Sequence, residues 1–113
     1  MLTTPIPRYL LPHCADVIRR DNSDGWGGGG EKVIAKLGRV RIIPAHSQTF
    51  ALGGDIPQVS AKMFFDCVNS TPEGFGFRTG DVIRFMGREY TVQKVETYFA
   101  DGGDPHHLEV ILA

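Results

Sequence analysis

Apolar and polar residues alternate along several short stretches of the chain, and segments rich in glycine or proline separate these stretches. A repeat of two residues is typical of β-strands that bury one face. The pattern predicts strands at 13–21, 31–44, 61–68, 81–85, 90–99 and 106–113. About six short strands bounded by turns indicate an all-β fold, a small SH3-like or Greek-key β-barrel with a long inserted loop.

Two of the predicted strands move their apolar residues from one face to the other. In 31–44 the apolar positions change from odd to even numbers at Gly38, and in 90–99 they change between Val92 and Val95. A strand that changes its buried face must contain a bulge or a sharp bend. Such bends let a sheet curl into a barrel.

The segments between the predicted strands differ in character. Prolines in 1–12 predict an extended N-terminal segment without a regular helix. Residues 21–30 are expected to form a glycine-rich turn around Trp26, and Gly87 is expected at the tip of a hairpin. Residues 45–60 have no clean period and are long for a plain connection, which is typical of functional loops.

The strand predicted at 61–68 has a clear alternation. Odd-numbered positions from Ala61 to Cys67 are expected to face the core. This register places Phe64 and Asp66 on the outside of the barrel.

The length of 113 residues fits a single domain with its own core. The formal net charge of −1 gives no strongly basic face for nucleic acid, although residues 1–46 carry +3 and residues 47–113 carry −4. No apolar run approaches the ~18 residues of a membrane span. The N-terminal stretch lacks the basic region of a signal peptide, so we expect neither a membrane segment nor a leader.

The glycine-rich run at 25–30 invites comparison with phosphate-binding loops. Those loops need a Lys-Ser/Thr pair and a helix after the glycines. Here Glu31-Lys32-Val33 follow and begin a predicted strand. We therefore do not expect nucleotide binding.

Histidines and cysteines are the remaining candidates for chemistry. His106 and His107 are adjacent and therefore point to opposite faces of a strand, so they are not expected to share a metal ion. His107 and Glu109 share a face, but two ligands are fewer than a zinc site uses. Cys14 and Cys67 lie within apolar strand patterns, where thiols are buried and inert, and a single bridge between them stays open. We predict no catalytic residue, no metal and no cofactor.

Aromatic residues recur in the second half of the chain, at 64, 65, 75, 77, 85, 90, 98 and 99. A stacking platform for single-stranded nucleic acid combines such rings with a basic groove. The acidic balance of this half argues against that use. We expect most of the rings in the core, with Phe64 and the Phe75/Phe77 pair partly exposed.

The order of these parts resembles the small head–tail connector proteins of tailed bacteriophages and prophage-like elements, also called head-closure or minor capsid proteins. The resemblance rests on PIPRYLLPHCADVIRR, a glycine-rich turn, VIAKLGRVRIIP, a long loop, GDVIRFMGREYTVQKVE and HLEVILA. It covers nearly the whole chain, and the order and spacing of the parts are more specific than any single motif.

The resemblance implies a non-enzymatic barrel subunit that joins the portal or adaptor to the tail-completion proteins and helps to retain packaged DNA. Identical subunits would form a ring in the virion, assembled in the bacterial cytoplasm, and the isolated chain can remain a monomer. A ring of this kind needs two different faces that match each other. The family supplies no catalytic residues and no interface residues that map onto this sequence.

Apolar residues in the long loop are the main candidates for contact with a partner. Phe50, Leu52 and Ile56 lie among small and polar residues in 45–60, and Trp26 and Phe64 are weaker candidates. A partner would bury these side chains, unless the loop folds back as a lid on the barrel's own core. The alternative function is a free-standing SH3-like or oligonucleotide-binding module that recognises a peptide or a single strand.

Overall fold

The computed structural model describes residues 4–20, 31–44, 60–100 and 103–113. A short 3-10 helix, η1 (Arg8–Leu10), precedes the first strand. The strands are β1 (His13–Arg20), β2 (Glu31–Pro44), β3 (Ala61–Asp66), β4 (Val82–Phe85), β5 (Arg88–Phe99) and β6 (Pro105–Leu112).

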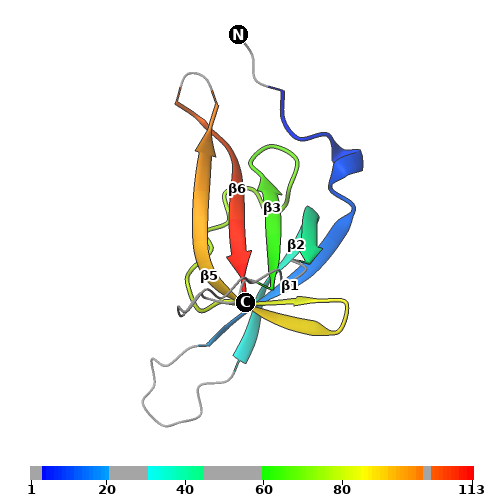
Figure 1. The fold of residues 1–113 in the computed structure, drawn as a ribbon, viewed down its shortest axis with the longest axis vertical. Coiled ribbons are helices and arrows are strands. Elements are labelled where there is room, and N and C mark those ends of the chain that lie inside the picture. The colour runs from blue at the N-terminus through cyan, green and yellow to red at the C-terminus, as the bar shows by residue number, and fades with distance from the viewer. Residues whose placement is uncertain (1–3, 21–30, 45–59, 101–102) are drawn as a thin grey trace, which may run out of the picture.

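The strands form a closed antiparallel barrel in the order β1-β2-β3-β6-β5-β4, with β4 returning to β1 (Figure 1). The prediction of a small all-β barrel of about six strands is confirmed. The C-terminal ends of β3 and β5, the start of β6 and η1 lie at one end of the barrel, at the top of Figure 1. We call this the upper end.

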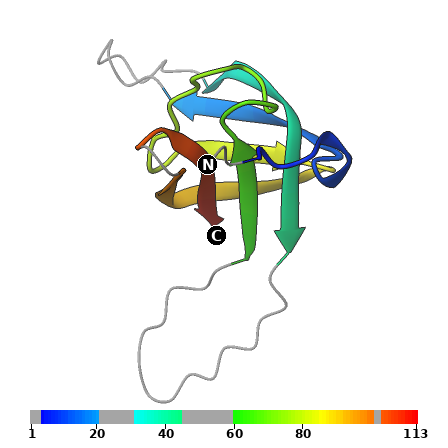
Figure 2. The ribbon, with the colours of Figure 1, turned by 90° about the horizontal axis from the view of Figure 1, so that it is seen from above.

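A sharp bend in β2 lets the sheet close. The register of β1 against β2 shifts where β2 passes Gly38, and Arg39 adopts a left-handed φ of 56°. The amide groups of Gly38 and Thr71 exchange two hydrogen bonds of 3.0 Å at this point. Figure 2 shows the result: β2 first runs with β1 and then turns to run beside β3. The predicted change of face at Gly38 is confirmed.

The core fills the barrel with the inward residues of all six strands. On β2 these are Leu37 before the bend and Val40 and Ile42 after it. The remaining core residues are Ala15, Val17, Ala61, Met63, Phe65, Ile83, Tyr90, Val92, Val110 and Leu112. Phe75 and Phe77 are half-buried and pack edge-on against each other, and Phe77 packs edge-on against Phe65. Core packing therefore accounts for this aromatic pair.

The hairpin between β4 and β5 turns at two residues, Met86 and Gly87, whose φ angles are 50° and 77°. Two successive left-handed residues define the tight turn that matches the twist of antiparallel strands. Gly87 thus lies at the tip, as predicted. The register of β5 against β6 shifts between Val92 and Lys94, which moves Val95 toward the core.

Some expectations for individual side chains are wrong. Asp66 is fully buried rather than outward, because the turn after β3 and the N-terminal segment cover it with amide groups. Cys67 lies beyond the end of β3 and is half-buried, and Cys14 is exposed. Both thiols are free, so no disulfide joins them. Val33 was expected inward but is exposed near the end of the β1–β2 ladder.

Candidate functional site

The upper end of the barrel is organised around the carboxylate of Asp66. It accepts hydrogen bonds from the backbone amides of Ile6 at 3.0 Å, Val68 at 3.0 Å and Asn69 at 2.8 Å. The side-chain amide of Asn69 donates to the Ile6 carbonyl at 2.8 Å. A buried carboxylate with several amide donors is well compensated. Asp66 therefore fixes both the turn after β3 and the N-terminal segment.

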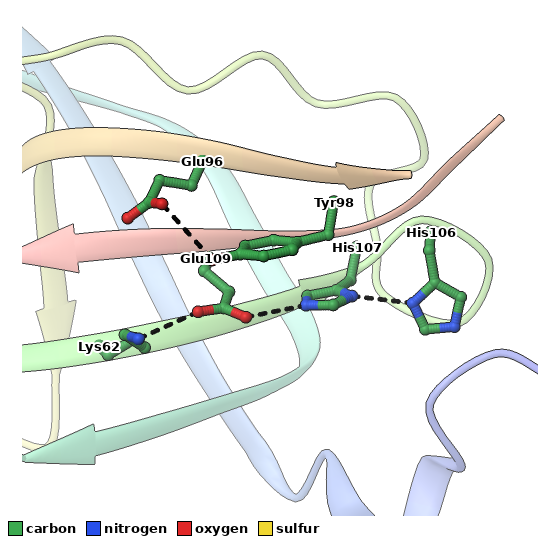
Figure 3. Close-up of polar contacts among 6 residues, drawn as sticks. All are labelled: Lys62, Glu96, Tyr98, His106, His107 and Glu109. Atoms are coloured by element: carbon green, nitrogen blue, oxygen red, sulfur yellow. Dashed lines mark hydrogen bonds and ion pairs between the residues drawn. The ribbon is translucent and has the colours of Figure 1, made fainter. Parts of the chain in front are cut away.

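Beside Asp66, a row of polar side chains crosses the outer face of β3, β6 and β5 (Figure 3). The Glu109 carboxylate accepts from Lys62 Nζ and from His107 Nε2, each at 3.0 Å. Burial alone would raise the pKa of Glu109, but the hydrogen bonds from His107 and Lys62 outweigh it and hold this pKa below its usual value. The Tyr98 ring stacks on His107, with centroids 4.9 Å apart and planes 3° from parallel.

The two histidines are in direct contact, which corrects the expectation that they point apart. The Nδ1 atoms of His106 and His107 are 2.8 Å apart, and His106 Nε2 is 2.8 Å from the Thr4 carbonyl oxygen. The strand begins at Pro105 with a register shift against β5, and this irregularity brings the rings together.

The hydrogen bonds of this histidine pair fasten the N-terminal segment. A backbone carbonyl only accepts, so His106 Nε2 donates to Thr4. The two Nδ1 atoms form a hydrogen bond of 2.8 Å with each other, and His107 Nε2 bonds to Glu109 at 3.0 Å. His106 thereby holds Thr4 at the upper end.

This arrangement does not suit a metal ion. Both Nδ1 atoms face each other and both Nε2 atoms have protein acceptors, so no lone pairs converge on a common point. Across the ranges that the structure describes, no group of three or more His, Cys, Asp or Glu side chains is arranged to hold a metal. Burial, together with the nearby charge of Asp66, raises the pKa of the Cys67 thiol, which lowers its reactivity.

Exposed apolar side chains surround the upper end on three separate segments. Tyr9 in η1 is 80% exposed, Val68 in the turn after β3 is 69% exposed, and Phe99 at the end of β5 is 65% exposed. We call these three residues the apolar rim. A hydrogen bond from Arg8 to Asn69 connects the segments that carry Tyr9 and Val68, and a backbone bond from Cys67 to His106 joins the turn after β3 to β6, which pairs with β5. Apolar side chains that a small barrel leaves exposed at one end favour a surface that contacts another protein.

A groove opens at the same end of the barrel. It has a volume of about 360 Å³ and is lined by the apolar side chains of Phe65, Phe75 and Leu108, among others. The rim and the groove together offer both protruding and hollow apolar surface to a partner.

The residues predicted from sequence as interface candidates are only partly placed. Phe64 is half-buried on the outer face of β3, between Lys62 and His107, in agreement with the expectation that it is partly exposed. Trp26, Phe50, Leu52 and Ile56 lie outside the described residues. Sequence reasoning did not find the apolar rim. In the sequence these residues appear only as apolar residues at strand ends or between prolines. The alternation of apolar and polar residues does not predict whether such positions are buried.

Comparison with known proteins adds no identification. No protein-family model matches the chain, and neither a curated protein nor a solved structure matches it. In the part of the chain that the structure describes, no helix has both the length and the apolar character needed to cross a membrane. The fold class, a closed six-strand antiparallel barrel, is established by the structure, and the connector family stays a prediction.

Proposed function

We propose that this protein is a structural subunit of a phage or prophage head–tail connector, which contacts neighbouring proteins through its upper end. The observation that carries the proposal is the apolar rim, because Tyr9, Val68 and Phe99 expose large apolar surface that the barrel itself does not bury. The rim supports the proposal independently of the family resemblance, which rests on the order of the sequence segments.

The upper end is also held rigidly, which favours a role in assembly. Asp66 and Asn69 fasten the N-terminal segment that carries Tyr9, and His106 fastens Thr4. A surface held in place before binding loses little conformational entropy on docking. The side chains of the rim therefore meet a partner in a defined arrangement.

The distribution of charge is suited to a ring of identical subunits. Residues 1–46 carry a net +3 and residues 47–113 a net −4. In a ring, one face of each copy must match a different face of the next, and opposite charges favour such a contact. The portal or adaptor and the tail-completion proteins would then occupy the two open sides of the ring, closing the head on its DNA.

Co-sedimentation tests this proposal directly. The purified chain is mixed with portal–adaptor complexes of the encoding phage or prophage and run through a density gradient. We expect the wild-type protein to move with the complex and a Tyr9→Ser/Val68→Ser double variant to remain at the top, although both melt at similar temperatures. Wild-type protein that stays at the top of the gradient would overturn the proposal.

A further inference from the structure

A second surface with a different character lies beside the bend in β2. It is a groove of about 480 Å³ lined by Arg8, Leu11, Pro12, His13, Cys14, Gly38, Arg39, Asn69 and Thr71. A neighbouring hollow of about 580 Å³ shares Cys14, Gly38 and Thr71 with it and adds Lys36 and Arg84. Because the two hollows share part of their lining, we call them together the depression.

The groove carries Arg8 and Arg39 and, among the described residues that line it, no carboxylate. The neighbouring hollow includes Asp16, and its Arg84 is paired with Glu89 at 2.9 Å. Burial and, after it, the charge of Arg41 lower the pKa of His13. The nearby carboxylate of Asp66 is already occupied by three backbone amides.

Arg39 lines the groove with a side chain that is available to a ligand. Within the described ranges its side chain makes no ion pair and no hydrogen bond, and its side chain is exposed. Arg8 has one long contact, from Nε to Asn69 Oδ1 at 3.4 Å. A guanidinium has five donors in a planar fork, so these two side chains leave most of their donors available.

The backbone conformation at position 39 does not favour an arginine, so folding alone does not explain this residue. Its φ of 56° is a conformation that glycine adopts freely and that residues with a side chain adopt uncommonly. The neighbouring Gly38 is required for a separate reason, since a Cβ at that position would lie 2.8 Å from Thr71 Oγ1. A glycine at position 39 would satisfy the fold better. Strain that the fold does not require is a feature of functional positions.

From the groove, its charge and the unpaired Arg39, we propose that this depression binds an acidic segment of a protein partner. Carboxylate side chains fit the planar forks of Arg8 and Arg39, and an extended segment would continue toward Lys36. Nucleic acid is the less suitable occupant. The chain has a net charge of −1, and a duplex or single strand is held by a longer series of cations than this depression offers. The proposal does not depend on the connector role.

Titration of the 15N-labelled full chain with a hexaglutamate peptide at low salt tests the proposal. We expect chemical-shift changes at His13, Cys14 and Thr71. The Arg39→Gly variant should bind about fivefold more weakly, as expected for the loss of one partly exposed ion pair. Its melting temperature should equal or exceed that of the wild type, because the left-handed strain is removed. Arg8→Gln is a second variant, which leaves the bend in β2 intact and should also weaken the binding of hexaglutamate.

Lys94→Ala is the matched control, because it removes one positive charge from the exposed surface of β5, away from the groove. It should bind hexaglutamate as the wild type does. Equal weakening by Lys94→Ala, or shifts spread over the whole surface, would show nonspecific attraction and overturn the proposal. Tighter, steeply salt-dependent binding of a 12-nucleotide single strand or a 12-base-pair duplex at the same residues would overturn it in favour of nucleic acid.

Discussion

The ion pair between Arg19 and Asp81 should contribute strongly to the stability of the barrel. Asp81 is 2% exposed and accepts hydrogen bonds from Arg19 Nε and Nη2, each at 2.8 Å, and from the Arg78 backbone amide at 2.9 Å. Arg19 also donates to the Gly76 carbonyl at 3.0 Å. These contacts join the end of β1 to the turn before β4, the seam where the barrel closes.

The variant Asp81→Asn removes the charge and leaves Arg19 without its counter-ion. Breaking a fully buried pair costs about 3–5 kcal/mol, and since Arg19 keeps some solvent contact we expect about 2–3 kcal/mol. For a domain of this size that loss lowers the melting temperature by roughly 10 °C. Urea denaturation should show an earlier midpoint with an unchanged slope.

The same pair predicts how stability changes with pH. Burial alone would raise the pKa of Asp81, but hydrogen bonds from Arg19 and the Arg78 amide outweigh it and lower this pKa below its usual value. A lowered pKa in the folded state stabilises the protein fully above the unfolded value of about 3.9. That stability is lost as the pH falls through the folded pKa. The difference between wild type and Asp81→Asn should therefore shrink below pH ~4.

The exposed pair of Arg84 and Glu89 is the matched control. Its atoms are 2.9 Å apart, but Glu89 is 53% exposed, so Glu89→Gln should change the unfolding free energy by less than ~0.5 kcal/mol. The reasoning would be refuted by an Asp81→Asn variant as stable as this control. It would equally be refuted by a difference from wild type that stays constant between neutral and acid pH.

Two further predictions concern the bend in β2 and the histidine pair. Gly38→Ala should cost about 1–2 kcal/mol because its Cβ meets Thr71 Oγ1 at 2.8 Å, and adding Thr71→Ala should recover part of the loss; additive costs in urea unfolding would argue against this contact. Imidazole 15N spectra should show His106 and His107 coupled by a hydrogen bond between their Nδ1 atoms, and His107→Gln should abolish this coupling. Two rings without such coupling would contradict the contact.

The period of two residues was enough to predict the barrel and most of its core. It also located the bend at Gly38, because a change of buried face leaves a mark in the sequence wherever the strand is long enough to show both registers. The turn at Gly87 was predictable for a similar local reason, since the tight hairpin requires left-handed residues.

The features of the upper end were not predictable, because they depend on contacts between distant segments. Asp66 looks like an outward residue by alternation, yet amides from Ile6 and from the following turn enclose it. His106 and His107 should point apart in a regular strand, but an irregular register at Pro105 joins them. The alternation pattern describes each strand separately and carries no information about contacts between segments that are distant in the sequence.

Incorporation into particles tests the connector proposal most directly. The encoding phage or prophage is induced with wild-type protein, with Tyr9→Ser/Val68→Ser/Phe99→Ser, or with Met86→Ser as a control of equal type, since Met86 is 83% exposed at the β4–β5 turn. Purified particles are then probed for the protein by mass spectrometry and by immunogold labelling of the neck. We predict the wild type and Met86→Ser at the neck, and the folded triple variant absent from particles that fail to retain DNA. Absence of the wild-type protein from the particles, or normal incorporation of the triple variant, would contradict the account.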